Sequence, residues 1–134
     1  MVIDTSALLA ILLDEPERRA MIDAIERHPA RSISVATFVE CSLVLESRFG
    51  PEGPRDLDLL IARADVTLVP VDIDQAHVAR AAYRRFGKGR HAAGLNFCDC
   101  FAYALSCTLG EPLLFKGGDL ALTDVAQAIT AAAP

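Results

Sequence analysis

The amino-acid sequence predicts an α/β domain, in which helices cover both faces of a short, parallel central sheet in a three-layer α/β/α arrangement. Four short apolar segments alternate along the chain with patterns of helical spacing. The apolar segments are continuous, as is typical of parallel strands buried on both faces. With 134 residues, 52% of them hydrophobic and 23% charged, the chain fits a single domain over residues 1–134, and this composition excludes a disordered chain.

The first half of the chain is expected to contain two strands, at residues 1–3 and 32–35. Thr5 or Ser6 is expected to cap the first helix, since both hydroxyls precede a run of good helix formers. Gly50-Pro51 is a helix stop signal. The helices predicted here are 7–13, 16–28, 37–49 and 55–64.

The second half repeats this alternation, with strands expected at residues 67–71 and 112–115. Asp72 or Asp74 is expected to cap a helix that ends near Phe86, and a basic, glycine-containing loop follows it. The last predicted helix covers residues 97–109, with Gly110 just beyond its end.

Compartment and thiol state can also be predicted. The longest stretch without a charged residue, 100–110, is shorter than the roughly 20 residues that span a bilayer. Asp4 follows Met1 to Ile3 directly, unlike the basic start of a secretory signal, so we expect a cytoplasmic protein. The cysteines lack zinc-knuckle spacing and are expected to be reduced, buried thiols. They are Cys41, Cys98, Cys100 and Cys107.

Four acidic residues occupy positions that favour a metal site. Asp4 and Asp119 each follow a predicted strand, and ligands of parallel sheets bind at the carboxyl ends of the strands. Glu40 and Asp99 stand between apolar residues, where a carboxylate is costly unless it is paired or bound to a cation. Four such carboxylates together favour Mg²⁺ and metal-dependent hydrolysis of a phosphodiester.

The segments around these acids resemble a PIN domain, and the whole chain resembles the VapC toxins of VapBC toxin–antitoxin pairs. The resemblance lies in residues 1–8, the helix with Glu40, and segments 96–104 and 114–124. It implies an endoribonuclease that depends on Mg²⁺ or Mn²⁺ and cuts structured RNA such as tRNA or ribosomal RNA. It also implies a homodimer that a cognate VapB antitoxin silences in a toxin–antitoxin complex.

The resemblance also implies roles for individual residues. Asp4 and Asp99 are expected to bind the metal directly, and capping of the helix that follows is the alternative role of each. Glu40 and Asp119 are expected to bind it directly, to bind it through water, or to orient the attacking water.

Further residues are expected to support this site. Thr5 and Ser6 are placed to hydrogen-bond to a carboxylate or phosphate, and Asp124 to add another acid near the metal. The chain departs from the common family pattern at Gly118, where Asn or Asp is usual, and at Leu120, where Phe is usual.

The net charge of −5 suggests repulsion from nucleic acid, but the charge is unevenly distributed. No acid lies between Asp74 and Asp99, and the basic residues there are expected to share one side of a helix and its following loop. Contact with RNA phosphates is the functional interpretation of this strip, and an ordinary solvated helix face is the alternative. The strip consists of Arg80, Arg84, Arg85, Lys88 and Arg90.

The sequence leaves two other functions open. Lys116 at a strand end is typical of phosphoacceptor signalling domains, although no aspartate follows the strand at 32–35 as that class requires. A non-catalytic RNA-binding module on the same fold is the second alternative. The apolar helices between Thr37 and Ala64 offer a candidate surface for the dimer and the antitoxin.

Overall fold

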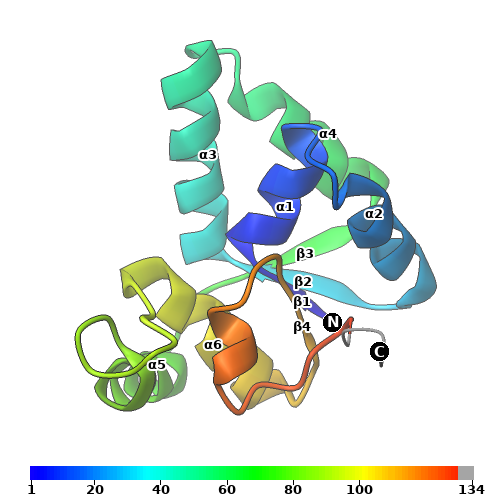
Figure 1. Ribbon diagram of the computed structural model, residues 1–134. Helices are drawn as coiled ribbons and strands as arrows, with labels where there is room; N and C mark the ends of the chain where they lie inside the picture. Colours follow the sequence, from blue (N-terminus) through cyan, green and yellow to red (C-terminus); the bar gives the residue numbers. More distant parts are fainter. Residues whose placement is uncertain (130–134) are drawn as a thin grey trace.

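The computed structural model describes residues 1–129. Within this range, four parallel strands form one sheet in the order β3-β2-β1-β4, flanked by six α-helices (Figure 1). The strands are β1 (Val2–Ile3), β2 (Arg31–Ser34), β3 (Val66–Val69) and β4 (Leu113–Leu114). The helices are α1 (Thr5–Leu12), α2 (Arg18–Arg27), α3 (Val35–Phe49), α4 (Pro54–Arg63), α5 (Ile73–Phe86) and α6 (Phe97–Leu109). A 3₁₀ turn, η1 (Leu120–Leu122), which the sequence did not predict, follows β4.

The helices cover both faces of the sheet. In Figure 1, α1 to α4 lie on one side of the strands, and α5 and α6 lie on the other. Successive strand residues point to opposite faces, so Ile3 and Leu114 join the core with α1 to α4, while Val2 and Leu113 join the core with α5 and α6. The predicted three-layer α/β/α architecture is confirmed.

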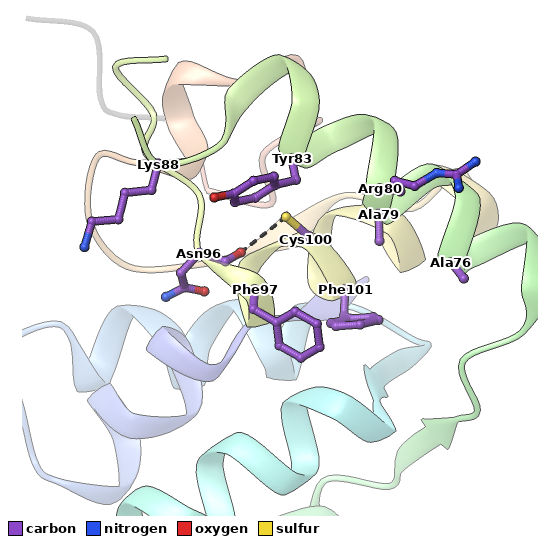
Figure 2. A pocket seen from close by; sticks show the side chains of 9 residues that line it. All are labelled: Ala76, Ala79, Arg80, Tyr83, Lys88, Asn96, Phe97, Cys100 and Phe101. Carbon is purple, nitrogen blue, oxygen red and sulfur yellow. Dashed lines mark hydrogen bonds between the residues drawn. The ribbon is translucent and has the colours of Figure 1, made fainter. Parts of the chain in front are cut away.

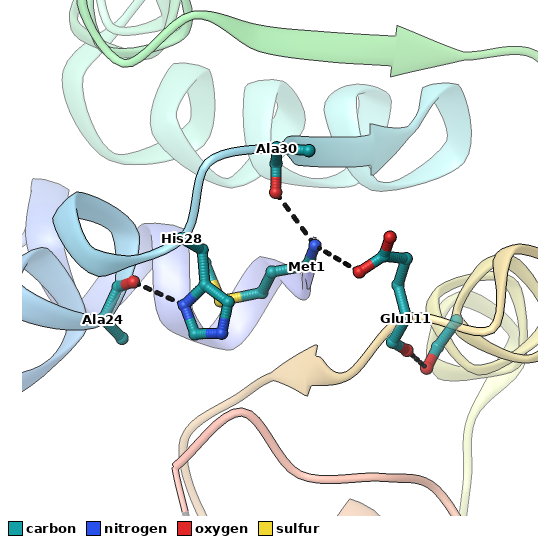
Figure 3. Close-up of polar contacts among 6 residues, drawn as sticks. Met1, Ala24, His28, Ala30 and Glu111 are labelled. Atoms are coloured by element: carbon teal, nitrogen blue, oxygen red, sulfur yellow. Dashed lines mark hydrogen bonds and ion pairs between the residues drawn. The ribbon is translucent and has the colours of Figure 1, made fainter.

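The short strand β1 is anchored along its length between β2 and β4. Figure 3 shows the ammonium group of Met1 donating to the carbonyl of Ala30 at 2.9 Å and to Glu111 Oε2 at 3.0 Å. These residues precede β2 and β4, so the three segments are tied together where the strands begin. At the other end, the N–H of Asp4 donates to the carbonyl of Leu114 at 2.9 Å. Asp4 is therefore held at the carboxyl edge of the sheet.

The helix ends largely follow local chemistry. Helix α6 has the predicted bounds, and Gly110 ends it in the left-handed conformation at φ 65°. Asp72 caps α5 by accepting from the N–H of Gln75. At α1, Thr5 and Ser6 do not cap the helix as predicted; the side chain of Asp4, the alternative cap, accepts the N–H of Ser6.

The four cysteines are free thiols, but they are not all buried. Cys41 and Cys100 are buried and Cys98 is half-buried, whereas Cys107 is exposed on the last turns of α6. The prediction of four buried thiols is wrong for Cys107. In the part of the chain described, no helix has the length and apolar character needed to cross a membrane.

Candidate active site

Three elements bring the sequence-predicted acids to one region. Asp4 follows β1, Glu40 lies on α3, and Asp99 lies in the first turn of α6. The carboxylates of Asp99 and Glu40 both raise the pKa of Asp4, and those of Glu40 and Asp119 raise the pKa of Asp99. Asp4, Glu40 and Asp99 therefore lie within electrostatic reach of one another, and Asp119 lies within reach of Asp99.

Asp4 is the most buried of the four, at 4% exposure. Burial raises its pKa from 3.8 to about 6, and the nearby Asp99 and Glu40 carboxylates act in the same direction. Ser6 opposes this shift, because its N–H and its hydroxyl both donate to Asp4 Oδ2, at 3.0 and 2.6 Å. Asp4 is thus a fixed carboxylate that is costly to ionise.

Ser6 also links Asp4 to the segment after β4. Its Oγ accepts the N–H of Lys116 at 2.9 Å, which joins α1 to the chain that leads to Asp119. The ammonium group of Lys116 is paired with Glu15 and, at 3.6 Å, with Glu17. Lys116 is therefore paired with the connection between α1 and α2, and it does not take the strand-end role expected of a phosphoacceptor domain.

Asp99 is oriented by the start of its own helix. Its Oδ2 accepts the N–H of Asn96 at 3.0 Å, while its N–H donates to Asn96 Oδ1 at 2.9 Å, which together form a capping box. Burial raises the pKa of Asp99, and the Glu40 and Asp119 carboxylates raise it further. The residue combines a helix-capping role with a place among the acids.

The charge and donor chemistry of this region fit a hard divalent cation. The groups that raise the pKa of Asp4 and Asp99 are burial and other carboxylates, and among residues 1–129 no basic side chain offsets them. The Oγ1 of Thr5, next to Asp4, is a buried oxygen without a hydrogen-bond partner within the described chain. Oxygen donors of this kind suit Mg²⁺. Over residues 1–129, however, no three acidic, histidine or cysteine side chains are grouped closely enough to form a metal-ligand set.

One thiol, that of Cys98, also lies close to these acids. Burial raises the pKa of Cys98 to about 12, together with the adjacent Glu40, Asp99 and Asp4 carboxylates. Because a thiol attacks a substrate as its thiolate, this raised pKa disfavours Cys98 as a nucleophile.

Asp124 is engaged away from these acids. Its Oδ1 accepts the Tyr103 hydroxyl at 2.5 Å, and its Oδ2 lies 3.3 Å from Arg85 Nη2. These two contacts hold the pKa of Asp124 below its usual value. The structure therefore places this sequence-predicted residue in a link between α5, α6 and the end of the described chain.

The five basic residues of the strip do not all lie in the same surroundings. Arg80 and Lys88 line a groove between α5 and α6, and the Arg90 guanidinium lies 5.9 Å from the centre of the Tyr83 ring. Arg84 is exposed on α5. Arg85, in contrast, turns to Asp124 and stacks over Phe86 at 4.6 Å, so the prediction that all five cations share one side without a counter-acid is wrong for this residue.

Aromatic side chains in this groove were missed at the level of sequence. Tyr83, Phe97 and Phe101 line it, and Phe97 is 75% exposed. The spacing of Phe97 and Phe101 is also that of an ordinary helix core, so only their exposure distinguishes them.

Comparisons with known proteins identify relatives along nearly the whole chain. A family model described as "PIN domain" matches residues 1–126. The chain is 59% identical over 126 residues to Ribonuclease VapC of Mycolicibacterium smegmatis, covering 94% of this chain and 98% of the relative. It is 56% identical to Ribonuclease VapC30 of Mycobacterium tuberculosis, with 94% and 96% coverage.

Two solved structures share the fold at low sequence identity. The crystal structure of Mycobacterium tuberculosis VapC20, described as a sarcin-ricin loop cleaving toxin, aligns with a TM-score of 0.76 at 16% identity, covering 94% of this chain and 96% of that one. A toxin-antitoxin complex from Klebsiella pneumoniae aligns with a TM-score of 0.69 at 17% identity, covering 97% and 98%.

Proposed function

The chain belongs to the VapC ribonuclease toxins, which are built on the PIN domain, and from this premise we propose that it is a Mg²⁺-dependent endoribonuclease. The proposed site consists of Asp4, Glu40, Asp99 and Asp119. The observation that carries the proposal is that the Asp4, Glu40 and Asp99 carboxylates lie within electrostatic reach of one another, and Asp119 within reach of Asp99, with no basic partner among residues 1–129. Mn²⁺ satisfies the same donor chemistry.

In this site, Asp4 and Asp99 would hold the cation, with Glu40 and Asp119 binding it or orienting the attacking water. A bound divalent cation stabilises charge on the phosphate and lowers the pKa of water. Ser6 fixes the Asp4 carboxylate through two hydrogen bonds, and Asn96 fixes that of Asp99. These fixed orientations reduce the reorganisation needed when substrate binds.

The proposed substrate is structured RNA, such as tRNA or ribosomal RNA, and the proposed partners are a second copy of the chain and a VapB-type antitoxin. The solved VapC20 is described as a sarcin-ricin loop cleaving toxin, and the Klebsiella structure as a toxin-antitoxin complex. Large apolar side chains are exposed on α3 and α4, which supports this surface as the antitoxin site. They include Val39, Leu43 and Leu59.

Replacing Asp99 with Asn tests the proposed function. The Asn side chain keeps an oxygen that can accept the N–H of Asn96, so the capping box and the fold should persist. Loss of one carboxylate should lower the rate of Mg²⁺-dependent cleavage of total RNA by at least about 100-fold. The rate is measured by gel, with EDTA as the metal-free reference.

Asp58→Asn is the matched control, because Asp58 is an exposed acid on α4. It should cleave at the wild-type rate. If Asp99→Asn cleaves RNA at the wild-type rate, Asp99 is not part of the site. If cleavage is undiminished in EDTA, the reaction does not depend on a divalent metal.

A further inference from the structure

A groove of about 620 Å³ lies between α5 and α6, outside the acidic site. Figure 2 shows Tyr83 on the α5 side, Phe97 and Phe101 on the α6 side, and Lys88 and Arg80 toward opposite ends. The volume lies within the range of roughly 300–1,000 Å³ typical of pockets that hold small molecules. Among residues 1–129, no acidic side chain lines the groove.

The aromatic rings of this groove are accessible. Phe97 is 75% exposed and Tyr83 is 41% exposed, although both are large side chains. Phe97 packs edge-on against Phe101, with ring centres 4.9 Å apart and ring planes at 78° to each other. The faces of the two rings therefore point in different directions. Such a side chain has no evident role in the core and offers a surface on which a planar group can stack.

The cations around these rings are also available. The ion pairs formed within residues 1–129 do not include Arg80, Lys88 or Arg90, although Arg80 Nη2 lies 3.3 Å from His77 Nδ1. Planar aromatic faces bordered by unpaired cations complement a nucleotide, which has a flat base and an anionic phosphate. A purely aliphatic partner would leave these cations without an anionic contact.

The groove adjoins the acidic site through one turn of helix. Asn96 lines the groove and holds Asp99 through the two hydrogen bonds of the capping box, and Phe97 is the next residue along. A nucleotide chain cut near Asp99 would therefore pass the mouth of the groove.

We propose that the groove between α5 and α6 binds an unpaired base of the RNA substrate, stacked on Phe97 and Tyr83, while Lys88 and Arg80 contact the flanking phosphates. This inference rests on the proposed ribonuclease function and extends it. It assigns to the enzyme a preference for single-stranded nucleotides next to the cleaved bond. Bases in a duplex are already stacked and paired, so they do not enter.

The proposal is tested with Phe97→Ala, using a short single-stranded oligoribonucleotide that carries a fluorescent adenine analogue. Titrations are made in EDTA, so that binding is measured without cleavage. Loss of one stacking surface should weaken binding about 5- to 150-fold. Since no charge is removed, the slope of log affinity against log salt should stay the same.

Two controls separate stacking from other effects. Phe49→Ala removes an equally large ring, 60% exposed on α3 and away from the groove, and should bind as the wild type does. Lys88→Ala should instead reduce the salt slope by about 0.7, the contribution of one phosphate contact on a single strand. A duplex of the same length should bind Phe97→Ala and wild type equally.

Three results would overturn the proposal. One is unchanged single-strand affinity in Phe97→Ala, and another is an equal loss in Phe49→Ala. The third is conversion of a dimer to a monomer by Phe97→Ala, seen by light scattering, with unchanged affinity per chain, because the groove would then be covered by a second copy. Cleavage of total RNA by the wild-type protein in Mg²⁺ is measured in parallel. If the wild-type protein does not cleave RNA, the proposed ribonuclease function is refuted. If it cleaves RNA and any of the three results is found, only the proposed role of the groove is refuted.

Discussion

Asp4→Asn is expected to stabilise the metal-free protein. The pKa of Asp4 is about 6 in the folded chain, against 3.8 for an unperturbed carboxyl. Between these values the folded state binds the proton more tightly than the unfolded state, so stability falls as pH rises. The cost is complete above pH 6 and amounts to about 3 kcal/mol at most. Asparagine carries no charge, so the variant avoids this free-energy cost of ionising a buried side chain.

The substitution should leave the local hydrogen bonds in place. The Asn oxygen can accept both the N–H and the hydroxyl of Ser6, as Asp4 Oδ2 does now. Urea unfolding in EDTA at pH 8 should therefore show Asp4→Asn to be up to about 3 kcal/mol more stable than wild type. Near pH 4 the difference should largely disappear.

The same variant should lose its response to metal. Mg²⁺ should stabilise wild type at pH 8 by binding the folded carboxylates, and it should stabilise Asp4→Asn much less. Asp58→Asn, which removes an exposed acid, should follow wild type in both media. If the advantage of Asp4→Asn is absent at pH 8, or is the same at pH 4 and pH 8, the assigned burial cost is wrong.

Two further substitutions test the packing that positions the site. In urea unfolding, Gly53→Ala should destabilise the protein by about 1–3 kcal/mol, because a Cβ there would collide with the carbonyl of Leu45. Gly118→Ala is the control and should be nearly neutral, because open space surrounds Gly118. Leu105→Ala should cost about 2–5 kcal/mol, since the side chain is fully buried between α6 and the sheet, while Leu109→Ala, at 47% exposure, should change stability far less.

Local chemistry decided how far the elements could be predicted. Helix α6 was predicted with its observed bounds because Gly110 terminates it in a conformation that other residues adopt poorly. The start of α1 was missed because Asp4, Thr5 and Ser6 are all competent caps. Only the pairing of β1 with β4, which fixes the backbone at Asp4, selects among them.

The acids were predictable where they follow strands, and less so where they lie on helices. Asp4 is placed by the sheet itself, whereas Glu40 reaches the site through the packing of α3, which no local pattern encodes. Arg85 shows the same limit. It lies five residues after Arg80, and therefore about 140° around the helix, so its pairing with Asp124 depends on which side of α5 faces the rest of the fold.

The first turn of α6 couples the two proposed parts of the site. Phe97 and Asp99 are two residues apart, about 200° around the helix, so one side chain lines the groove while the other joins the acids. Asn96 touches both, since it lines the groove and holds the Asp99 carboxylate. A base that enters the groove therefore contacts the residue that orients an acid. Under this proposal, substrate binding and the orientation of the Asp99 carboxylate are linked through one capping box. Both depend on α6 beginning at Phe97.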